Sequence, residues 1–274
     1  MFDYSKLDTP EALAHIFHPR PSLAREPVLG ALNVDFAVDD GTTLACRFHL
    51  TSNTAPVILY FHGNGEVAAD YDMIGPMYTE AGMNFLVTDF RGYGWSTGTP
   101  TVTNMLGDSR FLLRECVDWM ARNQYTGPLF VMGRSLGSAC AIELCCREKE
   151  LIKGLIIESG FCDTLPLIKT LGIDTKGMDI REEECFNNRA KIAQVQLPTF
   201  ILHGSRDSLI PAEEAEKLQA TSGARSKEFQ VIPGADHNTM IAVGGTGYFT
   251  AIKKFIDKVT GASSWRRCRK TFRK

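Results

Sequence analysis

Short apolar runs alternate along the chain with segments in which apolar residues recur every three or four positions. The runs are typical of buried strands, and the longer period is typical of amphipathic helices. An alternating stretch at 34–50 predicts an antiparallel hairpin about Asp39-Asp40-Gly41. The apolar runs predict six more strands, at 55–61, 84–90, 128–133, 153–160, 198–204 and 227–233. Helical spacing predicts helices at 66–82, 104–123, 138–150 and 213–223 and from about residue 247.

Strands that alternate with helices in this way form parallel β-α units. The fold class expected is therefore α/β, with a doubly wound, mostly parallel sheet of about eight strands. Ligands of such sheets bind at the carboxyl ends of the strands. The glycine-rich segments that follow the predicted strands are accordingly the places where chemistry is expected.

The segment Gly133-Arg134-Ser135-Leu136-Gly137 lies between a predicted strand and a predicted helix. A serine at such a sharp turn has its hydroxyl exposed above the sheet, and small neighbours let the strand and the helix pass closely. We therefore predict that Ser135 is a nucleophile and not merely part of a glycine turn. The pattern leaves two roles open for Arg134, a structural ion pair or an anchor for an anionic substrate group.

A serine hydroxyl needs a base, and the base needs an acid that orients it. Only His203 and His237 follow Ser135 in the sequence. His237 lies in the loop after the last predicted strand and is chosen as the base, whereas His203 is expected to support the loop at the end of its own strand. Asp207 directly follows a strand and is chosen as the acid. Its rivals are Glu158, Asp163 and Asp236.

Five motifs occur in one order along the chain: H-G-N-G-E (62–66), D-F-R-G-Y-G-W-S (89–96), G-R-S-L-G-S (133–138), H-G-S-R-D-S-L-I-P (203–211) and G-A-D-H-N (234–238). Together they resemble the α/β-hydrolase superfamily, and most of all its Bem46-like branch of serine hydrolases, from about residue 30 to 258. The resemblance implies the α/β-hydrolase fold, with Ser135 as nucleophile, Asp207 as acid and His237 as base. It also implies an oxyanion hole made by the backbone N–H groups of Leu136 and Asn64, with Gly65 as the second choice for the latter.

Three parts of the chain are expected. Residues 1–30 form an N-terminal helical extension, 31–260 the α/β-hydrolase domain, and 261–274 a basic tail. Segment 161–196 is short, so a minimal cap is expected over the site. The apolar residues of this segment form either a wall for an acyl chain or the packing face of a helix; they are Phe161, Leu165, Leu167, Ile168 and Leu171.

Composition, charge and missing motifs limit the classes of partner and cofactor that are expected. The formal net charge of −2 gives no reason to expect nucleic acid, and no leader or membrane span is recognised, so a cytoplasmic protein is expected. The eight cysteines form no C-x-x-C pair, and no phosphate-binding loop is present, so neither a metal nor a cofactor is expected. His15 and His18 are interpreted as surface residues. The basic tail is either solvated or makes a weak contact with a membrane surface or a polyanion.

The function expected is a cofactor-independent serine hydrolase. It would cleave a carboxylic ester or thioester of a small-molecule or acylated substrate through an acyl-enzyme intermediate. Two alternatives stay open: a peptidase or amidase, and a binding protein that keeps the fold without turnover.

Overall fold

The computed structural model describes residues 4–38, 40–172 and 180–262. Its centre is one eight-stranded sheet in the order β1-β2-β4-β3-β5-β6-β7-β8. The strands are β1 (Ala31–Ala37), β2 (Thr43–His49), β3 (Val57–Phe61), β4 (Asn84–Thr88), β5 (Leu129–Arg134), β6 (Gly154–Glu158), β7 (Thr199–Gly204) and β8 (Lys227–Ile232). From β4 to β8 every neighbouring pair is parallel, whereas β2 pairs antiparallel with both β1 and β4. The predicted fold class and the predicted hairpin are confirmed.

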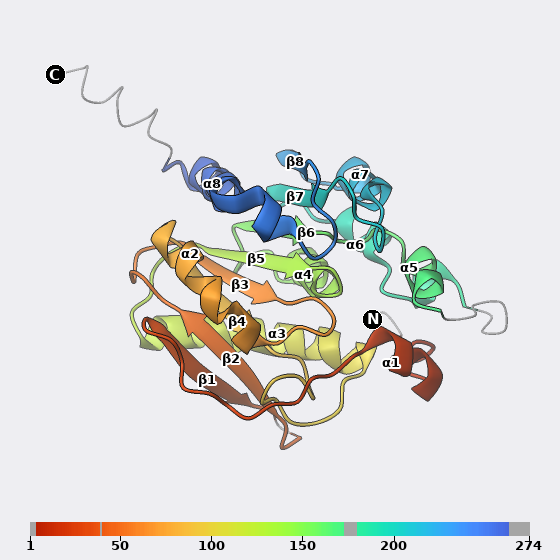
Figure 1. Ribbon diagram of the computed structural model, residues 1–274, viewed down its shortest axis with the longest axis horizontal. Coiled ribbons are helices and arrows are strands. Elements are labelled where there is room, and N and C mark those ends of the chain that lie inside the picture. The colour runs from red at the N-terminus through yellow and green to blue at the C-terminus, as the bar shows by residue number, and fades with distance from the viewer. Residues whose placement is uncertain (1–3, 39, 173–179, 263–274) are drawn as a thin grey trace.

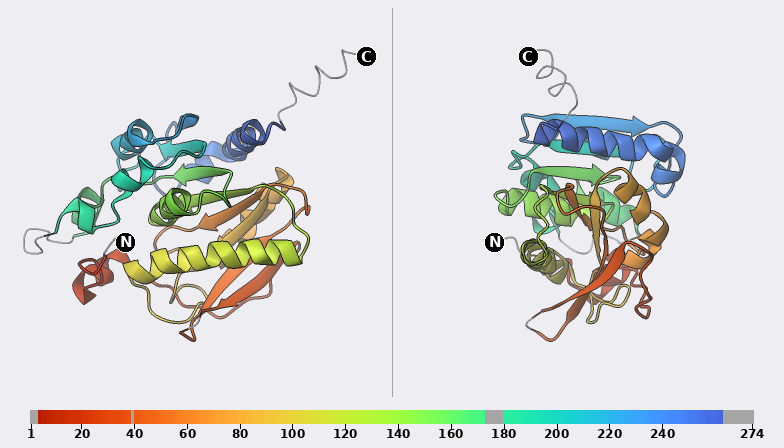
Figure 2. Two further views of the ribbon diagram at one scale, coloured as in Figure 1. Left: turned by 180° about the vertical axis from the view of Figure 1, so that it is seen from behind. Right: turned by 90° about the vertical axis from the view of Figure 1, so that its left-hand side faces the viewer.

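Helices cover both faces of this sheet. They are α1 (Pro10–Ile16), α2 (Gly75–Glu80), α3 (Val102–Arg122), α4 (Gly137–Arg147), α5 (Thr164–Thr170), α6 (Asn188–Ile192), α7 (Ala212–Thr221) and α8 (Met240–Thr260), with 3-10 turns η1 (Ala68–Met73) and η3 (Glu182–Glu184). Helices α2 and α8 lie in front of the sheet in Figure 1, and the view from behind in Figure 2 shows α3 and α4 on the opposite face. The layers therefore follow the doubly wound arrangement.

Strand β3 shows why the central strands read as continuous apolar runs. Val57, Leu59 and Phe61 pack into the core beneath α3 and α4. Ile58 and Tyr60 point to the other face and pack with α2 and α8. Because successive side chains of a strand point to opposite faces, a strand covered on both sides needs apolar residues at every position.

The single helix expected at 66–82 is replaced by η1 followed by α2. Pro76 lies in the first turn of α2, where its missing N–H costs nothing, but it cannot continue a helix from the preceding residues. The prediction of one helix here was wrong for that reason. The last helix begins at Met240, earlier than expected, and contains a non-helical residue at Gly245 with φ +50°.

Two segments outside the sheet approach its carboxyl edge. Between β6 and β7 the described chain forms only α5, η3 and α6. At the N-terminus, α1 begins at an N-cap Thr9 that accepts a hydrogen bond from Ala12 N–H.

The boundaries 1–30, 31–260, 161–196 and 261–274 stay predictions, and the basic cluster of the tail lies outside the described residues. No described helix is both long and apolar enough to cross a membrane.

Candidate active site

Ser135 follows β5 directly, at the turn into α4. Its backbone has φ +51°, a left-handed conformation that is unfavourable for a residue with a side chain. The turn is held because Ser135 N–H donates to Glu158 O (3.0 Å) and the Ser138 hydroxyl donates to Ser135 O (2.6 Å). A Cβ on Gly133 would meet Gly137 O, and one on Gly137 would meet Phe61 O. The glycines are therefore needed for the close approach of strand and helix.

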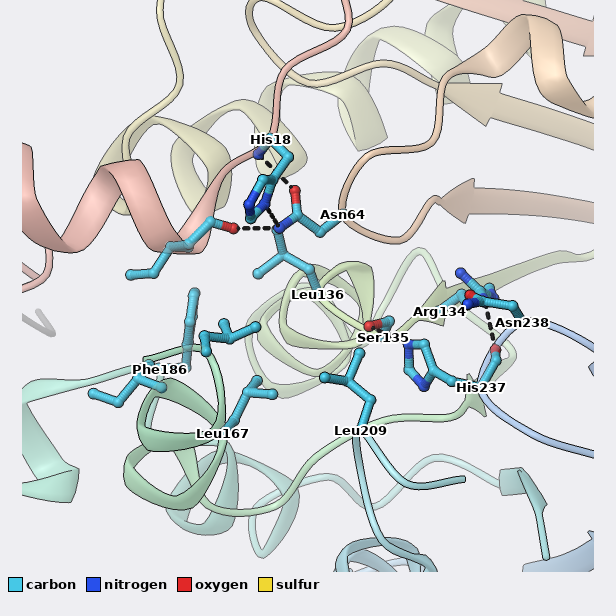
Figure 3. A pocket seen from close by; sticks show the side chains of 13 residues that line it. His18, Asn64, Arg134, Ser135, Leu136, Leu167, Phe186, Leu209, His237 and Asn238 are labelled. Carbon is cyan, nitrogen blue, oxygen red and sulfur yellow. Dashed lines mark hydrogen bonds between the residues drawn. The ribbon is translucent and has the colours of Figure 1, made fainter. Parts of the chain in front are cut away.

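His237 and Asp207 come from the loops after β8 and β7. His237 Nε2 lies 2.9 Å from Ser135 Oγ, and His237 Nδ1 lies 2.7 Å from Asp207 Oδ2. The other carboxylate oxygen of Asp207 accepts from the N–H groups of Leu209 (3.0 Å) and Ile210 (2.8 Å). The structure therefore brings the predicted serine, histidine and aspartate into one hydrogen-bonded chain (Figure 3).

The environment of Asp207 favours its charged form. Burial alone would raise its pKa, but the hydrogen bond and charge of His237, together with the N–H of Ile210, lower the pKa below its usual range. An ionised Asp207 accepts a hydrogen bond from His237 Nδ1–H, which leaves Nε2 unprotonated and free to accept the hydroxyl proton of Ser135. This is the tautomer that a general base requires.

The rival residues have other partners. His203 Nε2 lies 2.8 Å from Ile210 O, so this histidine supports the loop that carries Asp207. Glu158 accepts from the Tyr248 hydroxyl (2.5 Å), and Asp163 pairs with Arg189 (2.6 Å) and Lys217 (3.1 Å). Asp236 accepts from Asn238 N–H and the Thr239 hydroxyl. None of the three rival acids hydrogen-bonds to His237 among the described residues.

The sequence left two roles open for Arg134, a structural ion pair or an anchor for an anionic substrate group. Its contacts are those of the structural ion pair. Its guanidinium pairs with Glu66 and lies 3.3 Å from Glu158, its neighbour across β5 and β6. It also donates to the backbone carbonyl of His237 (2.5 Å) and to Asn238 Oδ1 (3.1 Å). Burial opposes its charge, but the two carboxylates raise its pKa. Arg134 is thus a buried cation that fixes the His237 loop to the turn at Ser135.

The two expected oxyanion donors lie at the ends of neighbouring strands. Leu136 follows Ser135, and Asn64 lies in the loop after β3, which pairs with β5. Neither backbone N–H donates to another described residue, as an oxyanion donor requires. The Asn64 side chain, by contrast, has several partners in the N-terminal segment.

A cavity of about 260 Å³ opens beside Ser135 and His237. Its wall is mostly apolar and contains Ile16, Leu136, Leu167, Ile168, Leu171, Phe186 and Leu209. Leu167, Ile168 and Leu171 of the predicted cap segment therefore line the cavity, whereas Phe161 is fully buried and Leu165 borders a different surface hollow. An apolar pocket with a few polar groups at one end is the usual form of a small-molecule site.

Sequence reasoning missed the N-terminal part of this cavity. Ile16 and His18 line it, although both precede the predicted domain, and His18 was interpreted as a surface residue. His18 is exposed and lies beside Asn64. In Figure 3, Leu136 is drawn between this pair and Ser135. The helical extension predicted at 1–30, with His15 and His18 interpreted as surface residues, carries no signal of this contact. Among the described residues no group of His, Cys, Asp and Glu forms a metal site.

Comparisons with known proteins show which family the chain resembles. The family model described as serine aminopeptidase, S33, matches residues 52–173 and 184–242. These ranges contain Ser135, Leu136, Asn64, Asp207 and His237. Protein bem46 of Schizosaccharomyces pombe is 28% identical over 231 residues, which cover 81% of this chain and 75% of that protein. The YfhR protein of Escherichia coli K12 is 26% identical over 237 residues, covering 82% and 80%. The predicted resemblance to the Bem46-like branch is confirmed.

Solved structures share the fold. An esterase of Pyrococcus furiosus superposes with a TM-score of 0.69 at 20% identity, covering 88% of this chain and 98% of that one. A monoglyceride lipase of Saccharomyces cerevisiae gives 0.65 at 20% identity, covering 86% and 96%.

Proposed function

The chain belongs to the α/β-hydrolase family whose model is described as serine aminopeptidase, S33, and we propose that it cleaves carboxylic esters or thioesters by acyl transfer. One observation carries the proposal: the hydrogen-bonded chain Ser135–His237–Asp207 lies at the end of an apolar cavity. The substrate proposed is a small molecule or an acylated molecule whose apolar part occupies that cavity. A cytoplasmic location and the absence of a nucleic-acid partner are proposed on sequence grounds alone.

The reaction proceeds in two similar halves. His237 Nε2 takes the proton of the Ser135 hydroxyl as Oγ attacks the substrate carbonyl, and the carbonyl π electrons move to oxygen. The backbone N–H groups of Leu136 and Asn64 stabilise this oxyanion. When it collapses, the bond to the leaving group breaks, and His237 gives its proton to the departing alcohol or thiol. Water then attacks the acyl-serine by the same steps and releases the acid.

The lining of the cavity favours an ester over a peptide with a free amino terminus. An aminopeptidase has to bind the substrate's α-ammonium group, which needs a carboxylate or several acceptors. The described residues that line the cavity include no Asp or Glu. Glu66 and Glu158 line a different hollow and pair with Arg134.

The test is hydrolysis of short p-nitrophenyl esters and labelling by a fluorophosphonate. Ser135→Ala should abolish labelling and lower kcat by at least about 10⁴-fold, because the nucleophile and its base act as a unit. Matched ester, thioester and anilide substrates rank the leaving groups, and faster cleavage of the anilide would favour the peptidase alternative. A Ser135→Ala protein that is still labelled, or that turns over at the wild-type rate, would refute the proposal.

A further inference from the structure

The segment 16–22, here called the N-terminal strap, begins at the last residue of α1 and contacts the loop after β3. It is tied to the loop after β4 by main-chain hydrogen bonds, from Gly94 N–H to Arg20 O (3.1 Å) and from Ser22 N–H to Gly94 O (2.6 Å). Ile16 and Phe17 are buried in the main core. The strap is therefore part of the packed domain and has a fixed position next to the site.

The Asn64 side chain joins the strap to the loop that carries the Asn64 N–H. Its Nδ2 donates to Ile16 O (2.7 Å), and its Oδ1 accepts from His18 N–H (2.8 Å) and from the Tyr93 hydroxyl (2.6 Å). A backbone carbonyl and a backbone N–H can act in only one sense, so these contacts fix the orientation of the amide. The dashed lines around Asn64 in Figure 3 show this arrangement.

The fixed amide also determines that His18 Nδ1 is the acceptor in their contact. The second Nδ2 proton of Asn64 is directed at His18 Nδ1 (2.7 Å), which must therefore be unprotonated to accept it. With this bond, both donors of the amide and both acceptor positions of its oxygen are used. A single side chain of the loop thus makes four hydrogen bonds, three of them to the strap.

The strap holds the next residue of the loop as well. Arg20 Nη1 donates to Gly65 O (2.8 Å) and pairs with Asp70 (2.7 Å). The backbone carbonyl of Gly65 and the side chain of Asn64 are therefore both attached to residues 16–20. Gly65 has φ +75°, a conformation that glycine adopts without steric penalty.

We propose that the strap is a positioning element of the active site: through the Asn64 side chain it holds the Asn64 backbone N–H where the oxyanion forms. The inference rests on the proposed function, because it presumes an oxyanion. A preorganised donor stabilises developing charge only when it is already in place, and a shift of about 1 Å can cost about 10²-fold in rate. The strap supplies that fixed position from outside the sheet.

The first test compares two asparagines. Asn64→Ala removes all four bonds of the side chain but keeps the backbone N–H. We expect kcat to fall about 10- to 100-fold with little change in KM, because the contact with the oxyanion exists only in the transition state. The matched control is Asn33→Ala, whose Nδ2 donates to Arg25 O (2.9 Å) and whose side chain does not line the cavity, so kcat should be unchanged.

Two milder changes test the same inference in variants that are expected to stay folded. Tyr93→Phe keeps the ring but removes the bond to Asn64 and the bond that the hydroxyl accepts from His18 N–H (2.8 Å). Tyr125→Phe is its control because Tyr125 packs on Trp119 away from the cavity. His18→Asn keeps an acceptor near the position of Nδ1, whereas His18→Leu removes it. We expect His18→Asn within about twofold of wild-type kcat and His18→Leu about fivefold lower, the value of one ordinary hydrogen bond.

Binding of a trifluoromethyl ketone, which forms a tetrahedral adduct with a serine, separates positioning from a structural role. If the strap positions the donor, the affinity for the ketone falls in proportion to kcat/KM across the variants. Variants that lose kcat but bind the ketone as wild type does would overturn the inference, as would an Asn64→Ala enzyme with kcat within twofold of wild type. A wild-type protein without Ser135-dependent turnover would instead refute the proposed function itself.

Discussion

The two sides of the proposed reaction centre, the triad side and the oxyanion side, are built in different ways. On the triad side, main-chain geometry at the ends of strands sets two of the three positions: Ser135 by its φ of +51°, and Asp207 by the N–H groups of Leu209 and Ile210. The His237 loop is held by the Arg134 side chain. On the oxyanion side, the loop with Asn64 is held by side-chain bonds to a segment outside the sheet. The positions of Ser135 and Asp207 are therefore set by local geometry, whereas the oxyanion side depends on contacts between distant parts of the chain.

The cations that support the two sides differ in how far they are exposed to solvent. Arg134 is buried and pairs with two carboxylates behind the triad, with 8% of its side chain exposed. Arg20 supports the oxyanion loop with 55% of its side chain exposed, and its partner Asp70 is 39% exposed. Buried charges depend strongly on their partners, whereas exposed pairs contribute little to stability. The four changes below test this contrast, from the largest expected effect to the smallest.

Asp207→Asn should have the largest effect. The amide can still accept from Leu209 and Ile210, but it no longer stabilises protonated His237 and it favours the wrong tautomer. We expect kcat to fall about 10⁴-fold while the protein stays folded. Steady-state hydrolysis of a p-nitrophenyl ester measures this. Asp163→Asn is the control, since Asp163 pairs with Arg189 and Lys217 and does not line the cavity. Equal losses in the two variants would contradict the assignment of the acid.

Arg134→Met should be the most destabilising change. It leaves Glu66 and Glu158 without their buried cation and removes the donor to His237 O. Breaking a buried ion pair from one side typically costs about 3–5 kcal/mol of unfolding free energy. Urea unfolding measures the loss, and kcat should fall too because the His237 loop is released. A loss below about 1 kcal/mol would show that the network behind the triad is not what holds it.

The same contrast explains what the sequence could predict. The sheet and the residues Ser135, Asp207 and His237 follow from strand patterns and from motifs only a few residues long, because parallel strands align their carboxyl ends. The role of Arg134 depends on partners in the loop after β3, in β6 and in the loop after β8, so the motif alone left it open. The strap was missed because His18 and Asn64 are 46 positions apart, and neither residue type indicates the other.

A buried histidine gives the triad side a dependence on pH. Burial lowers the pKa of His203, so in acid the unfolded chain binds a proton that the folded protein does not. Its contribution to stability is thus complete above the unfolded pKa, about 6.5, and is lost as the pH falls below it. His203→Gln keeps a donor for Ile210 O but does not titrate. Urea unfolding measures how much unfolding free energy each protein loses between pH 7 and pH 5. We expect this loss to be smaller by roughly 1 kcal/mol in the variant than in the wild type. The same loss in both proteins would exclude His203 as a source of acid sensitivity.

Arg20→Met should have the smallest effect on stability and is the counterpart of Arg134→Met. The pair with Asp70 is exposed to solvent, so we expect the unfolding free energy to change by less than about 1 kcal/mol. Gly65 O loses one donor, but Asn64 keeps its four bonds, so kcat should fall only about two- to fivefold, as expected for a single lost hydrogen bond. Urea unfolding and ester hydrolysis measure the two quantities on one preparation. A stability loss equal to that of Arg134→Met would mean that the exposed side of the site is as tightly coupled to the fold as the buried side. The difference between local and long-range construction would then have no energetic consequence.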